Sequence, residues 1–309
     1  MLLTELEKRH TSLATYILVR ASVLAARCGM KSKRFGKICR PLAWSQGDIF
    51  LMCLSSAQIA SAYILNKDSF PSSYKAFLSK QIGKDPVVLQ GLKELVNNNA
   101  LTSLPIIEKY YKTILHGNQS CTGHYFSFSL QAYGRALPVY VPVYLIPALA
   151  IHNTDLVRRT YSILGKNLLG IARSSLFLSV YCASEWGWTC LLFRMFERCN
   201  IPLLILGTFP TGLALLIEKK SRRIEISLYC LARAIESLSI CIAEAGLYPP
   251  QLRTKRADIV VFSISTSIVM HCYAQERDVF HSKYLDVLDW VFGVPVPYMN
   301  EYKICAPSK

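Results

Sequence analysis

The stretch CNIPLLILGTFPTGLALLIEKKSRR, from Cys199 to Arg223, decides how the rest of the chain is interpreted. Its first nineteen residues are uncharged and mostly apolar, and they run directly into a basic cluster. As an α-helix, such a run reaches about 28 Å, close to the roughly 30 Å thickness of the bilayer hydrocarbon. The cluster consists of four cations, Lys219, Lys220, Arg222 and Arg223. At the end of a span these cations would lie among lipid headgroups, so the stretch predicts a membrane-spanning helix.

The composition also favours a membrane protein. The 309 residues have a mean hydropathy of +0.27, and only 18% of them are charged, whereas about 25% is typical of soluble domains. The charges gather between apolar runs, several of which have no polar face. A soluble all-helical protein with uncharged core helices is the competing interpretation. We expect an all-α, polytopic integral membrane helix bundle with about five or six transmembrane helices.

The formal net charge of +15 raises the question of a nucleic-acid partner. The Lys and Arg residues flank apolar runs and form no continuous patch, so the lipid bilayer and its anionic lipids are the expected partners. We find no nucleic-acid-binding motif and expect no nucleic-acid partner. The eleven cysteines include no CxxC pair, and several lie inside apolar runs. Buried, reduced thiols are therefore expected.

The distribution of charge divides the chain into five parts. Residues 1–46 form a basic amphipathic N-terminal segment, which suits a helix on a membrane surface; a mitochondrial transit peptide and a solvated tail are the alternatives. Residues 47–66 form the first transmembrane helix, and residues 67–135 form a helical loop region. Residues 136–293 form a helical membrane domain, and residues 294–309 form a tail.

Six runs with few or no charges are candidate crossings. They are Ile49–Asn66, Ala136–Thr154, Ser174–Phe193, Cys199–Ile217, Ile224–Leu247 and Ile259–Gln275. Three prolines interrupt the second run, and membrane helices tolerate these as kinks where neighbours satisfy the freed carbonyls. Six crossings would place both termini on one face, but the bias in positive charge is weak. Five crossings, with the run 224–247 lying on the surface, is the alternative.

The run 224–247 carries the most promising functional side chains. Its charged residues fall within one arc of a helix, and an acid from the run 174–193 could join them. These residues are Glu225, Arg233, Glu236, Glu244 and Glu185. Ionisable groups at membrane depth cost several kcal/mol unless they are paired or face water. They therefore indicate a polar pathway or intramembrane pairing inside the bundle, or else an interfacial helix whose charges lie in water.

Three further motifs have two interpretations each. The basic cluster 219–223 could contact anionic lipid, at roughly 1 kcal/mol per charge, or could only fix the topology. Cys121 and His124 have CxxH spacing, which is half of a zinc site without a second half, and we expect no metal. Asn118 begins a glycosylation sequon that matters only if its loop enters the secretory lumen.

Enzyme motifs are absent from the sequence. We find no GxSxG elbow, P-loop, GxGxxG, HExxH or catalytic triad context. We therefore expect no catalytic residues and no cofactor, and a protein that is not an enzyme.

Four pieces of the segment from Ala136 to Gly293 resemble a known family. They are VYVPVYLIPAL (Val139–Leu149), IEKKSRR (Ile217–Arg223), ADIVVFSISTSIVM (Ala257–Met270) and KYLDVLDWVFG (Lys283–Gly293). IEKKSRR, with a tyrosine and a glutamate downstream, is the most specific of them. The segment resembles the N-terminal half of transmembrane protein 135 and covers about half of the chain.

This resemblance implies a compartment and a process. Larger members carry two related halves, so this chain resembles a single-repeat relative. They also carry a cysteine-rich region before the first span, of which only Cys121 and His124 remain near the corresponding place. The family is similar, more remotely, to the channel-type subunits of the mitochondrial inner-membrane import machinery.

The resemblance implies an integral protein of a peroxisomal or mitochondrial membrane that acts in organelle organisation, dynamics or lipid homeostasis. The resemblance carries over no catalytic residues. We also expect membrane-protein partners or a homo-oligomer. The alternative function is a transporter or pore lined by Glu185, Arg233 and Glu236.

Overall fold

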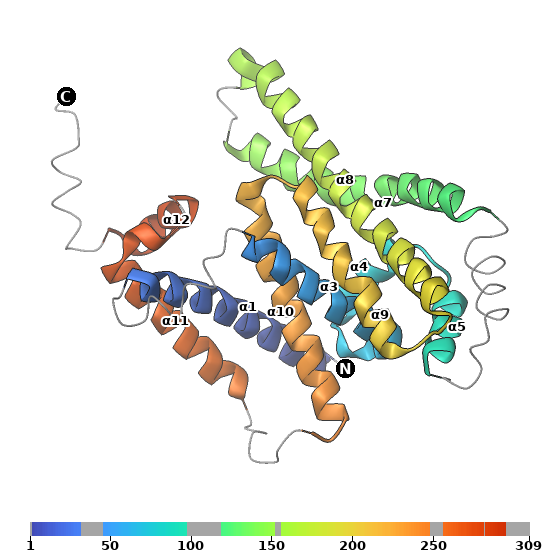
Figure 1. Ribbon diagram of the computed structural model, residues 1–309. Coiled ribbons are helices and arrows are strands. Elements are labelled where there is room, and N and C mark those ends of the chain that lie inside the picture. The colour runs from blue at the N-terminus through green and yellow to red at the C-terminus, as the bar shows by residue number, and fades with distance from the viewer. Residues whose placement is uncertain are drawn as a thin grey trace. The chain divides into compact units, whose positions relative to one another are not determined.

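The computed structural model describes residues 2–31, 46–97, 119–151, 156–247, 256–280 and 282–294. Within these ranges every regular element is a helix (Figure 1), which confirms the predicted all-α class. Parts of the predicted N-terminal segment and loop region, the sequon at Asn118 and almost all of the tail lie outside the described residues. The chain forms two compact units: unit 1 comprises residues 1–12 and 46–252, and unit 2 comprises residues 13–45 and 253–309.

Four helices in the described part are long and apolar enough to cross a membrane. They are α3 (Gly47–Leu65), the Leu164–Phe196 part of α8 (Leu156–Phe196), α10 (Lys220–Glu244) and α11 (Ala257–Gln275). They correspond to the first, third, fifth and sixth predicted crossings. At 1.5 Å per residue, α8 is about 60 Å long, twice the hydrocarbon thickness. One end of α8 must therefore extend beyond the hydrocarbon.

The prediction of a single α-helix over Cys199–Ile217 is wrong. The run consists of α9 (Ile201–Thr208), whose first turn is capped by Asn200, and of the 3-10 helix η4 (Phe209–Ile217). Pro210 has no N–H to donate to the carbonyl four residues earlier, so the α-helix ends before it. Because a 3-10 helix rises about 2.0 Å per residue against 1.5 Å in an α-helix, α9 and η4 together still extend about 30 Å.

The second predicted crossing lies in α7 (Cys121–Ile151), which contains all three prolines of that run. The structure places residues 121–135, predicted as part of the loop region, in this same helix. The boundary predicted between residues 135 and 136 therefore falls inside a continuous helix. Within the described residues, α7 is not among the four candidate spans, and the predicted crossing continues to Thr154, outside the described residues.

Unit 1 is packed around α3 (Figure 1). This helix contacts α10, η4 and α9, while α8 contacts α7, η4 and α9. Two thirds of the apolar window of α3 is buried. Its small residues, Ser55, Ser56, Ala57, Ala60, Ser61 and Ala62, are buried, and such residues let neighbouring backbones approach closely. Two shorter helices complete the unit: α4 (Ser72–Ile82) packs on α7, and α5 (Pro86–Asn97) contacts α3.

The approach of η4 to α3 depends on Gly212. A Cβ atom on this residue would lie 2.6 Å from the Cα atom of Cys53, and closer still to the Cys53 backbone nitrogen. Real Cβ atoms do not approach backbone this closely, so only glycine fits without a shift of one segment.

Unit 2 contains residues 13–31 of α1 (Leu2–Lys31), α11, the 3-10 turn η6 (Arg277–Val279) and α12 (Ser282–Phe292). Asp289 connects α12 to α11 and η6. Its two carboxylate oxygens accept hydrogen bonds from Arg277 Nη2 and from the Tyr273 hydroxyl, each at 2.6 Å. The Arg277 guanidinium holds the pKa of Asp289 below its usual range.

Two cations of the basic N-terminal segment, Arg20 and Arg27, contact other residues of unit 2. Arg20 lies 4.8 Å from the ring centroids of both Tyr16 and Tyr284. Arg27 donates through Nη1 to the carbonyl of Val279 at 3.0 Å. The N-terminal segment therefore forms the expected helix over residues 2–31, but these two arginines bind other parts of the chain.

Replacing Gly212 by alanine is expected to destabilise unit 1 by about 1–3 kcal/mol, because the added methyl group overpacks the contact with α3. The matched control is Gly134→Ala on α7, where nothing lies within 4 Å of the new methyl group. This control should keep or raise the stability, since alanine is the better helix former. Thermal unfolding in detergent micelles measures both, and equal melting temperatures would contradict the close packing of η4 on α3.

Candidate functional site

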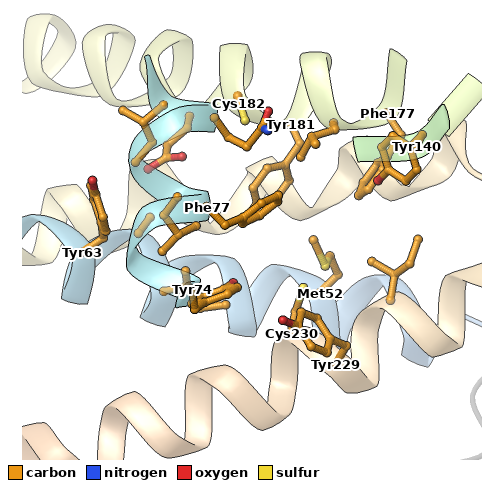
Figure 2. Close-up of a pocket in the computed structure, with 18 of the residues that line it drawn as sticks. Met52, Tyr63, Tyr74, Phe77, Tyr140, Phe177, Tyr181, Cys182, Tyr229 and Cys230 are labelled. Atoms are coloured by element: carbon orange, nitrogen blue, oxygen red, sulfur yellow. The ribbon is translucent and has the colours of Figure 1, made fainter. Parts of the chain in front are cut away.

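A cavity of about 330 Å³ lies inside unit 1, and α3, α4, α7, α8 and α10 all contribute to its wall. We call it the central cavity (Figure 2). Most of its lining is apolar or aromatic. Seven aromatic side chains take part: Tyr63, Tyr74, Phe77, Tyr140, Phe177, Tyr181 and Tyr229. Figure 2 shows Tyr181 reaching in from α8 and Tyr229 from α10, and the rings of Tyr229 and Tyr74 meet edge to face at 6.2 Å.

Helical periodicity explains why these residues share one cavity. On α4 the lining residues are Tyr74, Phe77, Leu78, Gln81 and Ile82, which are spaced as one face of a helix. The lining residues of α10 repeat the same spacing between positions 222 and 230. Burial raises the pKa of the Tyr74 hydroxyl well above its ordinary value, so this residue stays neutral.

A few polar groups interrupt the apolar wall. Gln81 is 2% exposed, and its Nε2 atom donates to the Arg135 carbonyl at 3.4 Å, while its Oε1 atom has no partner in the described part of the chain. Glu185 of α8 and Glu225 of α10 also line the cavity, with Arg222. Across the described ranges, no hydrogen-bond donor or cation is recorded at the Glu185 carboxylate. The cavity thus combines apolar surface with a few polar side chains in its lining.

Arg222 belongs to a hydrogen-bonded network centred on Glu218, a glutamate with no exposed surface. Ser174 Oγ donates to Glu218 Oε2 at 2.8 Å, and the backbone N–H of Lys219 donates to Oε1 at 3.2 Å. Arg222 donates to Ser174 Oγ at 3.2 Å and to the Tyr144 hydroxyl, and its Nη1 lies 4.0 Å from the Glu218 carboxylate. We call these four side chains the Glu218 network; it connects α7, α8 and α10.

The basic cluster predicted to contact lipid is divided by the structure. Arg222 is bound in the Glu218 network. Arg223 donates to the carbonyls of Leu216 and Glu218, at 2.7 and 2.9 Å, and so satisfies the end of η4. Lys219 and Lys220 are exposed. Of the four cations, the two lysines are therefore the ones available to lipid headgroups.

The charged stripe predicted on the fifth crossing is divided as well. Arg233 Nη1 contacts Glu236 Oε2 at 2.8 Å, and Ser12 Oγ accepts from Arg233 at 2.8 Å and donates to Glu236 Oε1 at 2.6 Å. Glu225 and Glu185 line the central cavity instead. Glu244 is exposed and accepts a hydrogen bond from Asn66 Nδ2. The structure therefore brings Arg233 and Glu236 together and places Glu185 in a separate site.

Cys121 and His124 each have a different neighbour. Arg194 Nη1 donates to Cys121 Sγ at 3.3 Å, and His124 Nε2 lies 3.1 Å from Lys84 Nζ. Both residues line a second cavity of about 290 Å³. Among the described residues, no group of three or more His, Cys, Asp or Glu side chains could hold a metal ion. The nine cysteines of this part are free thiols, and all except Cys121 are buried or half-buried.

Sequence reasoning missed Gln81 and three members of the Glu218 network. Gln81 fell in a region predicted to be a loop, although the spacing of the α4 lining residues was a usable signal. Glu218 was visible as the acid that opens the EKKSRR run. Its partner Ser174, and Tyr144, which is hydrogen-bonded to Ser174 and Arg222, are distant in sequence, and only the fold brings them near.

Replacing Arg233 by leucine is expected to lower the stability of unit 1 by about 3 kcal/mol, because it leaves the Glu236 carboxylate buried without its cation. Glu236 is only 5% exposed, and the Arg233 side chain 12%. The double variant Arg233→Leu/Glu236→Leu should recover part of the loss, since it removes both charges. Thermal unfolding of the three proteins is the measurement.

The same arginine variant examines the pore alternative. Solute flux through reconstituted vesicles should collapse for a pore lined by Arg233, whereas a non-conducting protein should lose only stability. An Arg233→Leu protein as stable as the original would contradict the buried pair.

Comparison with known proteins places part of this site in a family. The sequence profile of the N-terminal cysteine-rich region of Transmembrane protein 135 matches residues 111–242. The match covers α7, α8, α9, η4 and α10, and it includes six of the eleven cysteines. The expectation that only Cys121 and His124 remain of that region was therefore wrong, because the region extends through the apolar helices. No curated protein and no solved structure matches the chain.

Proposed function

Because this chain belongs to the transmembrane protein 135 family, through the match of residues 111–242, we propose that it acts in lipid homeostasis by holding an apolar molecule in the central cavity. In this proposal it is a non-enzymatic protein of a peroxisomal or mitochondrial membrane. The family and the four apolar candidate spans make it an integral membrane protein. The organelle and the process are our inference.

The central cavity is the observation that carries this proposal. Its volume of about 330 Å³ falls within the roughly 300–1,000 Å³ range of small-molecule sites. Three of the helices that line it, α3, α8 and α10, are candidate membrane spans. A mainly apolar cavity between such helices suits the hydrocarbon part of a lipid.

Contacts with the membrane and with other proteins complete the proposal. The exposed Lys219 and Lys220 suit anionic headgroups, at about 1 kcal/mol per charge. Only 17% of the apolar window of α11 is buried inside the structure. Such a surface suits lipid, a partner membrane protein or a second copy of the chain, and a role in organelle organisation would act through these contacts. No nucleic-acid partner is proposed.

The transporter or pore alternative receives less support from the geometry. It requires Glu185, Arg233 and Glu236 to line one path. Of these, only Glu185 lines the central cavity, while the other two form a pair with Ser12.

A tagged copy is expected to enter the peroxisomal or mitochondrial membrane and to remain in the pellet after alkaline carbonate extraction, because its apolar helices are embedded in the bilayer. Fractionation with soluble and integral marker proteins is the measurement. Release into the soluble fraction would overturn the membrane assignment, and retention in another organelle would overturn the proposed compartment.

Filling the cavity should abolish binding of an apolar probe. Leu178 lines the cavity, whereas Leu176 on the same helix is 46% exposed. Leu178→Trp is expected to lower crosslinking of a photoreactive dodecanol analogue to α4, α8 and α10 by about tenfold or more, because the indole occupies its space. Leu176→Trp should leave crosslinking unchanged.

A second filling variant, Ala60→Phe on α3, acts from another part of the wall in case Leu178→Trp fails to fold. Mass spectrometry of the crosslinked peptides, on proteins in nanodiscs, is the measurement. Undiminished crosslinking in both folded variants would show that the probe binds elsewhere.

A further inference from the structure

The central cavity offers acceptors with unused hydrogen-bonding capacity. The Oε1 atom of Gln81 is buried and has no partner in the described structure. Because an unsatisfied buried acceptor destabilises the protein, a ligand that donates a hydrogen bond to it removes this cost. Glu185 adds a carboxylate on α8, at which no donor is recorded in the described ranges. Both side chains line the same cavity, so its polar side requires a donor and not an acceptor.

The balance of charge around the cavity points in the same direction. The Asp, Glu, Lys and Arg residues of its lining are Glu185, Glu225 and Arg222. Arg222 is already bound to Tyr144 and Ser174 and lies beside the fully buried Glu218, which is not part of the lining. Counting this pair as neutral leaves the Glu185 carboxylate as a negative charge in the wall. A ligand with an anionic head would meet repulsion there, and a cationic head would meet its counter-charge.

The aromatic wall also suits a cation. Ring faces attract ammonium and guanidinium groups within about 6 Å of the centroid. This region already uses the effect, because the Arg233 guanidinium lies 5.5 Å from the ring centroid of Tyr229 and 6.0 Å from that of Tyr74. Both rings also line the cavity. Tyrosine and phenylalanine rings therefore supply apolar contact for a chain and favourable electrostatics for an ammonium group.

We propose that the central cavity selects a single-chain amphiphile whose head is a protonated amine, with the head at Glu185 and a second hydrogen bond to Gln81 Oε1. An ammonium group has three N–H donors and no acceptor, which matches a carboxylate plus an amide oxygen. This inference rests on the proposed function, because it specifies the head group of the apolar molecule that the cavity holds.

The test is competition in nanodiscs of neutral phosphatidylcholine, where no anionic lipid attracts amines to the surface. The photoreactive dodecanol analogue is displaced by dodecylamine, dodecanol or dodecanoic acid, which share one chain and differ only in the head. Dodecylamine is expected to compete at about tenfold lower concentration than dodecanol, since charge-assisted hydrogen bonds are about twice as strong as neutral ones. Dodecanoic acid should compete least.

Variants connect this preference to the two side chains. Glu185→Gln should abolish the preference for amine over alcohol and retain alcohol binding. Gln81→Leu should weaken amine and alcohol alike, and the double variant should show non-additive losses if both residues bind one head group. Glu197→Gln, an exposed glutamate just beyond the end of α8, is the matched control and should keep the preference. Comparison with this control also corrects the measured preference for partitioning of the amine into the bilayer.

A gain-of-function variant keeps the test decisive if Glu185→Gln does not fold. Gln81→Glu preserves shape and adds one more carboxylate to the wall, so it should increase the preference for the amine. Equal competition by the three compounds, or an unchanged preference in Glu185→Gln, would overturn the amine inference and leave the proposed function standing. Failure of all three compounds to displace the probe from the cavity would overturn both.

Discussion

The burial of one carboxylate, that of Glu218, is the constraint on which unit 1 depends. A charged group with no exposed surface is tolerated only where several donors surround it. Ser174 of α8 and the backbone of Lys219 donate to it, and the cation of Arg222 of α10, which also donates to Tyr144 of α7, lies 4.0 Å away. Satisfying this group therefore fixes three helices at the point where η4 ends. Since α7, α8 and α10 also form much of the cavity wall, the same network sets the shape of the site.

The charged residues of unit 1 have different roles, and these roles follow from the burial of each side chain. Arg222, Arg223, Arg233 and Glu236 make contacts that hold the protein together. The exposed Lys219 and Lys220 are available to the surroundings, and Glu185 faces the cavity. The charged residues of a membrane protein can thus include structural, surface and cavity-lining members, and the sequence pattern alone does not separate them.

Length and hydropathy are local properties, and for this reason the sequence was sufficient to predict the all-α class and the positions of α3, α8, α10 and α11.

The effect of proline was not predictable in the same way. Pro138, Pro142 and Pro147 lie inside α7, whereas Pro210 coincides with the change from α9 to η4. The three-residue spacing of Arg233 and Glu236 placed them one turn apart, and they are in contact. The Glu218 network also requires Ser174 and Tyr144, which lie 44 and 74 residues before Glu218, and no local rule connects positions so far apart.

The 3-10 helix η4 gives unit 1 a mechanical property. Its nine-residue run is longer than most 3-10 helices. Relaxation to an α-helix would shorten this segment by about 4–5 Å. Such shortening would draw Glu218 away from Ser174 and move Gly212 along the backbone of α3, so the network at one end and the close packing in the middle hold the segment extended. Unit 1 thereby keeps a fixed hydrophobic length at this segment. A membrane of different thickness has to adapt to the protein, at a cost of fractions of a kcal/mol per Å, and this sorts such a protein among bilayers.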